Sequence, residues 1–197
     1  MFHNGLWEQI DMLDGSMTAK RANCSFDPAA GKYIVKLLNR CYVVAPQQRS
    51  IRKIDENTES DADYLEQLCL LAYLIYARDI PVSGQLVNPE SLPGGVFFFR
   101  GPHKLPTGKL AEAFCKMPDL LFDAAKKFAA RPETFGDASI TLDILPRIPI
   151  TLIVWGDEDE FAGRVSILFD STALEQMPFD ALWAAANLTA QALIRGF

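Results

Sequence analysis

The amino-acid sequence predicts an α+β fold: a single globular domain, residues 1–197, in which a mostly antiparallel sheet packs against several helices. Segments typical of strands come in groups, and so do segments typical of helices, whereas strict alternation would indicate a parallel sheet. The length of 197 residues and the hydrophobic content of 49% suffice for one sizeable core. No internal repeat or low-complexity tract divides the chain.

The first predicted element is a β-hairpin. Two runs rich in β-branched and aromatic residues, 32–38 and 41–46, flank Asn39-Arg40, which is a turn signal. The polar segment 47–61 that follows is typical of a connection.

A helix is predicted next, over about residues 61–78. Ser60-x-x-Asp63 resembles a capping box at its start. From Leu68 onward the helix is apolar almost all round, so we expect it to lie at the centre of the fold, covered on both sides. Prolines and glycines then mark residues 79–95 as a loop.

The second half of the chain predicts one aromatic strand, two short helices, three successive strands and a closing helix. Each assignment depends on apolar periodicity, on β-branched content or on a proline at an element boundary. In that order, their expected ranges are 96–100, 109–117, 118–130, 139–145, 148–155, 164–170 and 178–195.

Composition and charge argue against several classes of partner. The formal net charge of −6 disfavours a general nucleic-acid binder, because phosphate recognition requires clustered Lys and Arg. No apolar run approaches the roughly 20 residues of a membrane span, and the start of the chain lacks the pattern of a secretion signal. Phosphate loops, dinucleotide fingerprints and serine nucleophile elbows are missing, which disfavours an ordinary nucleotide enzyme or serine hydrolase.

One basic segment departs from this acidic balance. No acidic residue lies between Asp27 and Asp55, where the basic residues are Lys32, Lys36, Arg40, Arg49, Arg52 and Lys53. We interpret the segment as the solvated face of a hairpin, and the alternative is a shallow site for phosphate or carboxylate groups.

The four cysteines stand far apart, at positions 24, 41, 69 and 115. No pair has the C-x-x-C spacing that presents two thiolates to a metal. Cys69 and Cys115 lie in apolar helical settings and are expected to be core residues. A reduced, cytoplasmic location is the expectation that follows.

The first candidate site lies where the aromatic strand VFFFR runs into the turn GPHKLP. The imidazole of His103 has the chemistry to ligate a haem or corrinoid metal, and Arg100 can pair with an anionic group. The alternative is a loop histidine that hydrogen-bonds the backbone, with the phenylalanines in the core. The residues expected to bind the cofactor are His103, Arg100, Phe97, Phe99 and Gly95.

The second candidate site is the acidic run 157–160, which falls between two predicted strands and hence near a hairpin tip. Clustered carboxylates can bind a hard cation or act as an acid and a base. The acids of a calcium loop alternate around a central glycine, and that spacing is missing. A solvated acidic turn is the alternative to a metal site whose ligands would be Asp159, Glu160 and Asp170.

The order of the longer motifs is distinctive. LLAYLIYA is followed by PVSG, then by LPGGVFFFRGPHKLP, then by PITLIVWGDEDEFAGRVSILFDSTA. This order resembles the bacterial and archaeal family called domain of unknown function 3786, over about residues 64–177. The positions that carry the resemblance are Gly94, Gly95, Phe97 and His103, and then Trp155, Asp159, Glu160, Phe161, Leu168, Phe169 and Asp170.

The resemblance brings no assigned activity. It implies an association with anaerobic redox or corrinoid-dependent methyl-transfer systems, because some relatives carry an added cysteine-rich iron–sulfur module, which this chain lacks. If the acidic run and residues 167–170 form one motif, Phe161 packs inward and one carboxylate caps the loop or pairs with Arg164. Asp157 and Glu158 are then the expected solvated pair.

The leading hypothesis is a cytoplasmic, non-catalytic ligand-binding or accessory module. It would hold a flat anionic cofactor such as a tetrapyrrole, either haem or corrinoid, between the aromatic strand and the apolar helix. The expected partners are a small-molecule ligand and a redox or methyl-transfer protein, with no nucleic acid and no membrane. The alternatives are a metal-dependent enzyme that uses the acidic hairpin and a structural protein-interaction module.

Overall fold

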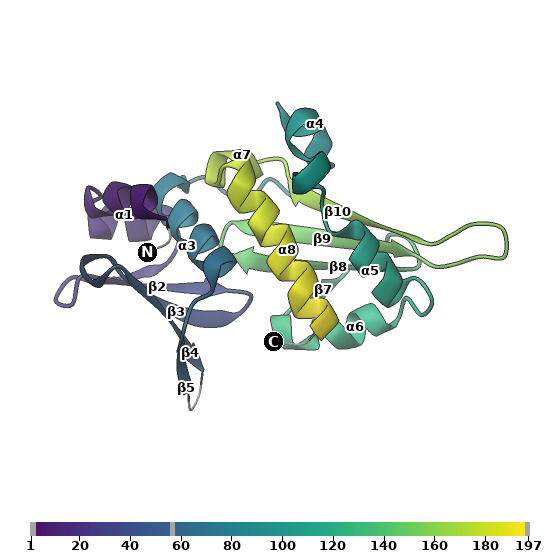
Figure 1. The fold of residues 1–197 in the computed structure, drawn as a ribbon, viewed down its shortest axis with the longest axis horizontal. Coiled ribbons are helices and arrows are strands. Elements are labelled where there is room, and N and C mark those ends of the chain that lie inside the picture. Colours follow the sequence, from purple (N-terminus) through teal and green to yellow (C-terminus); the bar gives the residue numbers. More distant parts are fainter. Residues whose placement is uncertain (1–2, 56–57, 196–197) are drawn as a thin grey trace.

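The strands of the protein form two antiparallel sheets. The computed structural model describes residues 3–55 and 58–195, and within these ranges each sheet has five strands. Sheet A has the order β1-β2-β3-β4-β5, and sheet B has the order β6-β10-β9-β8-β7. The predicted α+β class with antiparallel strands is thus confirmed, and the strands divide between two sheets (Figure 1).

Sheet A comes from the first third of the chain and contains the predicted hairpin. Buried residues face each other across it, for example Tyr33 opposite Val44. Its turn is formed by Leu38 and Asn39, whose φ angles of 49° and 61° match the type I′ turns that suit hairpins. The strands are β1 (Ser25–Asp27), β2 (Lys32–Leu37), β3 (Arg40–Ala45), β4 (Ser50–Asp55) and β5 (Thr58–Asp61).

Residues 47–61 are not the predicted connection, because they contain the hairpin of β4 and β5. Cross-strand ion pairs hold it: the Arg52 guanidinium contacts the carboxylates of Glu59 at 3.0 Å and Asp61 at 2.6 Å. The prediction was wrong because β5 is exposed along its whole length and has the polar composition of a loop.

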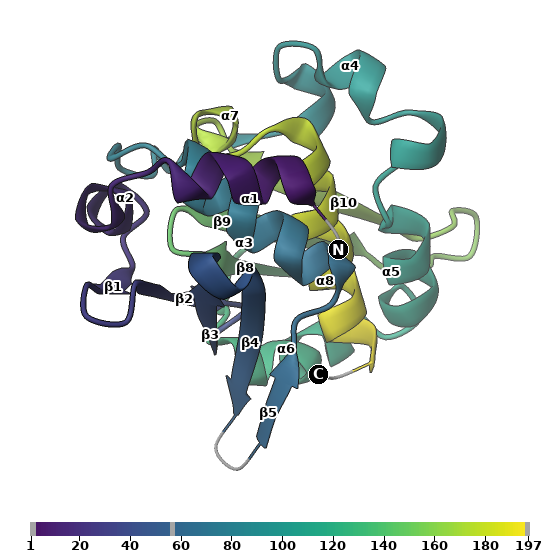
Figure 2. The ribbon, with the colours of Figure 1, turned by 60° about the vertical axis from the view of Figure 1, so that its left-hand side comes forward.

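The apolar helix is α3 (Tyr64–Tyr76), and it is buried at the centre of the fold as predicted. Its capping box is formed by Asp63 and Glu66, each of whose carboxylates accepts the backbone N–H of the other at 2.8 Å. The predicted partner Ser60 lies in β5 instead. Helices α1 (Asn4–Asp11) and α2 (Gly15–Arg21) pack beside α3 (Figure 2).

Glu66 also ties α3 to sheet A. Its side chain is fully buried and accepts hydrogen bonds from the Tyr42 hydroxyl at 2.5 Å and the Lys53 ammonium at 2.9 Å. Burial and the bond to Glu66 raise the pKa of Tyr42 well above its ordinary value. A buried charge with this many partners fixes one geometry between helix and sheet.

Sheet B contains the three predicted successive strands, and the predicted closing helix lies across one of its faces together with α5 and α6 (Figure 1). The strands are β6 (Leu86–Val87), β7 (Arg131–Pro132), β8 (Ala138–Leu145), β9 (Ile148–Trp155) and β10 (Arg164–Asp170). The helices are α5 (Thr107–Phe114), α6 (Leu120–Ala125) with the 3-10 turn η4 (Lys126–Phe128), α7 (Ala173–Gln176) and α8 (Phe179–Arg195).

The segment 96–100 is not the predicted strand. It belongs to a helical turn, α4 (Gly95–Phe98), between the 3-10 turns η2 (Pro89–Ser91) and η3 (Gly101–His103). Gly94 enters the turn with φ of 90°, and a Cβ atom on Gly95 would lie 2.0 Å from the carbonyl oxygen of Pro89. A short apolar run has no period that separates strand from helix, and here the two glycines decide the outcome.

The two sheets meet at the β2–β3 turn, where the N–H of Leu38 donates to the carbonyl of Ile144 in β8 at 2.9 Å. One cluster of buried apolar residues includes members from both sheets and from the helices. Among the residues that the structure describes, no helix has the length and apolar character of a membrane span.

Candidate functional site

The predicted aromatic site lies on a segment that projects from the body of the molecule, residues 94–104 (Figure 1). The imidazole of His103 stacks on Phe98, with ring centroids 4.4 Å and planes 19° apart. Phe98 stacks on Phe179 at 5.2 Å, and His103 meets Trp183 edge-on at 5.8 Å. The segment is thus attached to α8 by aromatic rings, whereas the predicted cofactor site requires it to face α3.

The predicted cofactor residues have different surroundings. Phe99 is 3% exposed and belongs to the aromatic cluster, whereas Phe97 is 81% exposed. His103 and Arg100 are exposed, and Gly95 is buried against η2. The structure brings His103 and Phe99 into one cluster, and it leaves Phe97 and Arg100 at the surface.

The acidic run forms the tip of the β9–β10 hairpin, which projects at one end of sheet B (Figure 1). Glu158 and Phe161 exchange backbone hydrogen bonds at 3.0 and 3.2 Å, so Asp159 and Glu160 are the two turn residues. All four acids are exposed. Phe161 is 69% exposed, so the expectation that it packs inward is wrong. A two-residue turn leaves this side chain at the tip, with no core beneath it.

The base of this loop is held by Asp157. Its carboxylate accepts the N–H of Gly163 at 2.7 Å, and its own N–H donates to the carbonyl of Cys115 at 2.9 Å. One carboxylate therefore caps the loop, but it is Asp157, so the expectation that Asp157 is only a solvated partner of Glu158 is wrong. The Arg164 guanidinium stacks over the Trp155 ring at 4.5 Å, a cation–π contact in place of the expected pairing with an acid.

Asp170 lies at the opposite end of β10 from the acidic tip, so the three predicted metal ligands do not come together. Its buried carboxylate accepts hydrogen bonds from the N–H groups and hydroxyls of Ser83 and Thr172, and from the N–H of Gly84. Burial alone would raise the pKa of Asp170, but these hydrogen bonds outweigh it and lower the pKa. Across residues 3–55 and 58–195, no three His, Cys, Asp or Glu side chains gather as a metal site.

Most of the predicted basic face is balanced by acids. The carboxylates of Asp55, Asp11 and Glu66 lie within 4.0 Å of Arg40, Arg49 and Lys53, respectively. Arg52 is paired with two acids of β5, as described above. Of the six basic residues, Lys32 and Lys36 are the ones for which the described chain offers no ion pair.

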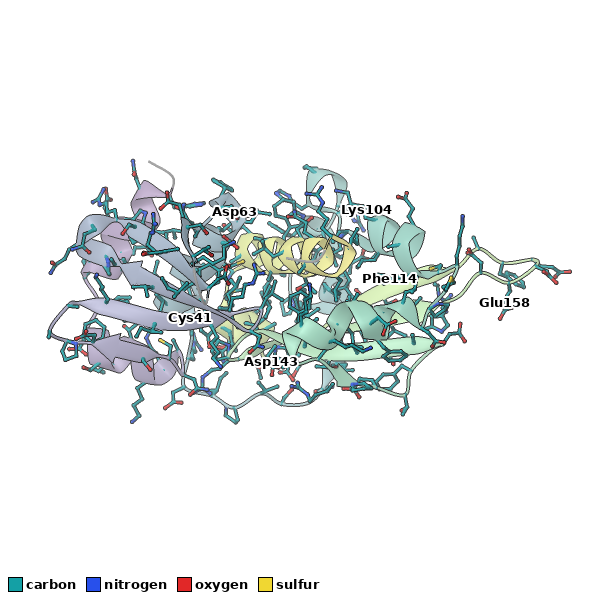
Figure 3. All side chains as sticks on the ribbon, turned by 90° about the horizontal axis from the view of Figure 1, so that it is seen from below. Cys41, Asp63, Lys104, Phe114, Asp143 and Glu158 are labelled. Atoms are coloured by element: carbon teal, nitrogen blue, oxygen red, sulfur yellow. The ribbon has the colours of Figure 1, made fainter. Side chains whose placement is uncertain are left out.

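Lys36 lines a cavity of about 430 Å³ where the two sheets meet, which we call the junction cavity. Figure 3 labels Cys41 of sheet A and Asp143 of sheet B, which contribute to its two sides. Its size falls in the usual range of small-molecule sites. The lining residues are Asn23, Cys24, Ser25, Ile34, Lys36, Asn39, Cys41, Phe128, Ala129, Asp143, Leu145 and Pro146.

Several polar side chains that line the junction cavity make no hydrogen bond to the rest of the described chain. In the part of the chain that the structure describes, no hydrogen bond engages the side chains of Asn23, Ser25, Lys36 or Asn39. Asn23 and Asn39 have φ angles of 49° and 61°, in the left-handed region that asparagine tolerates. All four residues are exposed, and together they line one hollow.

The two cysteines of the junction cavity differ in their surroundings. Cys41 stands directly opposite Lys36 in the β2–β3 register, so both side chains lie on one face of sheet A. Burial raises the pKa of the Cys24 thiol to about 11, although Arg21 opposes the shift. Cys24 is therefore a neutral thiol near pH 7.

A second groove of about 420 Å³ adjoins the junction cavity and shares Asp143 and Pro146 with it. Arg131 lines this groove and binds both oxygens of Asp143, at 2.9 and 3.0 Å. This bidentate pair neutralises the one acid of the junction cavity. It also raises the pKa of Arg131.

Sequence reasoning missed the junction cavity. Lys36 and Asn39 are singled out as a basic residue and as a turn residue, and the cysteines are noted only for their spacing. No local motif joins residues 23–25 to residues 128–129 and 143–146, because tertiary packing alone brings them together. The absence of acids around Lys36 is the one sequence signal that points toward the site.

Comparison with known proteins identifies the family. No curated protein and no solved structure matches the chain. A family model, Domain of unknown function (DUF3786), matches residues 14–192, which include both sheets, the aromatic segment and the acidic hairpin. This span covers most of the chain and contains every residue that lines the junction cavity. The chain belongs to the family of DUF3786 domains.

Proposed function

We propose that the protein is an accessory module that binds a small molecule in the junction cavity. The observation that carries the proposal is the convergence of four unengaged polar side chains, from β1, β2 and two turns, on one hollow of about 430 Å³. All four residues are exposed, so water satisfies these groups in the free protein and a ligand can replace that water. Their grouping around one concavity supports binding of a ligand.

The four free cysteines support a reduced compartment, so we place the protein in the cytoplasm. The family resemblance supports an accessory role beside a redox or methyl-transfer protein, and we include such a partner in the proposal. A ligand-binding module needs no catalytic group, which is compatible with the neutral thiol of Cys24 and the paired carboxylate of Asp143.

The experiment is a fragment screen by protein NMR on the full chain, repeated on Lys36→Ala. Fragments that bind the junction cavity are expected to shift backbone signals of β2, β3 and residues 128–129, and to lose affinity in the variant. Lys32→Ala is the matched control, since Lys32 lies on the same strand outside the cavity. Hits that cluster elsewhere and ignore Lys36→Ala would remove the proposal.

A second candidate function is tetrapyrrole binding at His103. The observation that favours it is an exposed imidazole and the exposed Phe97 on one projecting segment. The macrocycle would rest on the outside of this segment, because Phe98 and Trp183 occupy the inner side of the imidazole.

Titration with haemin and with cobalamins tests this second candidate. Binding through His103 is expected to give a spectral shift that His103→Ala abolishes and His3→Ala retains, since His3 is the one other histidine of the chain. Identical spectra for all three proteins would exclude His103 as a ligand.

A further inference from the structure

We infer that the ligand of the junction cavity is an amphipathic anion, with a single carboxylate or phosphate group bound by Lys36 and an apolar body along Ile34, Phe128 and Leu145. This inference rests on the proposed function, and it adds the chemical class of the ligand. Charge, hydrogen-bonding capacity and apolar surface each support it.

The charge of the lining favours an anion. Lys36 is the one cationic residue of the lining and has no ion pair in the described chain, whereas the Asp143 carboxylate accepts hydrogen bonds from the two terminal nitrogens of Arg131. Cys24 adds no negative charge at neutral pH, because burial raises its pKa to about 11. The sum is one uncompensated positive charge, which fits one anionic group. A cationic ligand would find no free carboxylate, and a polyphosphate would find too few cations.

Hydrogen-bond donors surround the same ammonium. Ser25 stands opposite Ile34 in the β1–β2 register, two residues from Lys36 along the strand, and Asn39 lies in the turn that follows β2. With Asn23, these side chains offer one hydroxyl and two amides that carry no internal hydrogen bond in the described residues. Together with the ammonium they can satisfy several oxygen atoms of a carboxylate or phosphate.

The rest of the lining is apolar. Ile34 is 42% exposed, although it lies in the middle of a strand, and it is on the same face as Lys36. Phe128 and Leu145 lie on the facing side of the cavity, in η4 and β8, and are 4% and 1% exposed, so Ile34 offers most of the apolar surface among these three residues. Covering the exposed Ile34 side chain with the apolar part of a ligand removes hydrocarbon surface from water and so favours binding.

The test uses four probes with six carbon atoms and different head groups: hexanoate, hexyl phosphate, hexanol and hexylammonium. Each is titrated into the full chain while alkylation of Cys41 by iodoacetamide is followed by mass spectrometry. We expect the two anions to protect Cys41, and the alcohol and the amine to protect it at least about 10-fold less well. The ratio of hexanoate to hexyl phosphate distinguishes a carboxylate ligand from a phosphate ligand.

Three variants connect the effect to the ammonium. Lys36→Gln is expected to weaken protection by the anions about 10-fold or more, Lys36→Arg to retain most of it, and Lys32→Gln to leave it unchanged. Equal protection by hexanol, stronger protection by hexylammonium, or an unaffected Lys36→Gln would each overturn the inference. If the fragment screen finds only uncharged ligands in the cavity, the inference of an anionic ligand is wrong, and the proposed ligand-binding function remains supported. If neither the probes nor the fragments bind the cavity, both fail.

Discussion

The junction cavity and the two projecting segments, residues 94–104 and the acidic loop 156–163, are built in opposite ways. The projecting segments are continuous stretches of chain with conspicuous sequences, and their tips are exposed: Phe97 is 81% and Phe161 69% accessible. The junction cavity is assembled from five separate stretches with ordinary sequences. Conspicuous motifs here mark local turns and caps, whereas the concave surface arises where two sheets meet.

The acidic residues also fall into two groups, buried acids that make many hydrogen bonds and exposed acids at the hairpin tip. Glu66 and Asp170 are buried and saturated with hydrogen bonds that hold helices or loops to the sheets. Asp159 and Glu160 stand on the acidic tip without an ion pair in the described chain. Acids that look alike in the sequence therefore divide into structural anchors and solvated tips.

The largest expected contrast is between the alkylation rates of three of the four thiols. Alkylation of native protein at pH 8 should modify Cys41 first, because it is half-exposed at the junction cavity. Cys24 should react far more slowly, since raising its pKa from 9.0 to about 11 leaves about 100-fold less thiolate. Cys69 is fully buried in α3 and should react only on unfolding, about 1,000-fold or more below Cys41.

Mass spectrometry of peptides sampled over time measures these rates. Urea should bring all four rates together and so serves as the control. A Cys41 that reacts as slowly as Cys69 in native protein would mean that the junction cavity is closed to small molecules.

The next contrast is between a buried acid and a tip acid. Glu66→Ala should lower the free energy of unfolding by about 3–5 kcal/mol, because Lys53 is left as a charge without its buried partner. Glu160→Ala, on the acidic tip, should change it by less than about 0.5 kcal/mol. Urea unfolding followed by circular dichroism gives both values, and we expect one transition because a single core cluster joins the sheets.

Similar losses in the two variants would contradict the division into anchors and tips. Two separate transitions would instead show that residues 1–197 are not the single domain that the sequence predicts.

Asp170 should make the stability depend on pH. Its pKa is lowered in the folded state, so its contribution is complete above the unfolded value near 3.8 and is lost as the pH falls through the folded value. Asp170→Asn should therefore lower the free energy of unfolding by about 1–3 kcal/mol at pH 7 and reduce the acid-induced loss below pH 4.

Thermal unfolding at a series of pH values tests this prediction, with Asp159→Asn, at an exposed acid of the hairpin tip, as the matched control. A wild-type pH profile in Asp170→Asn would show that the hydrogen bonds from Ser83 and Thr172 do not favour the charged carboxylate in the folded state.

Periodicity and turn chemistry predict much of this fold. The strands at 138–145, 148–155 and 164–170, the β2–β3 hairpin and the helix α8 follow from strong local patterns, and the central burial of α3 follows from its apolar surface. The errors have local causes. β5 forms in spite of its polar composition because cross-strand ion pairs stabilise it, and the segment 96–100 turns into a helix because Gly94 and Gly95 permit it.

The candidate site was less accessible to sequence reasoning. A cavity between sheets depends on which strands fall into which sheet, and a single sequence gives no signal for the division of antiparallel strands between sheets A and B. His103 illustrates the opposite error. Its rarity and its aromatic neighbours make it conspicuous, yet those neighbours are ring contacts that attach a projecting segment to α8.

The smallest expected effect concerns the backbone of the junction cavity. Ala129 ends η4 with φ of 52°, a left-handed conformation that favours glycine. Ala129→Gly should raise the free energy of unfolding by up to about 1 kcal/mol, because relief of strain exceeds the added entropy of the unfolded chain. Ala130→Gly should have the opposite sign, since Ala130 itself has no positive φ to relieve. Chemical denaturation of both variants measures the difference, and loss of stability in Ala129→Gly would show that its methyl group packs usefully against the cavity wall.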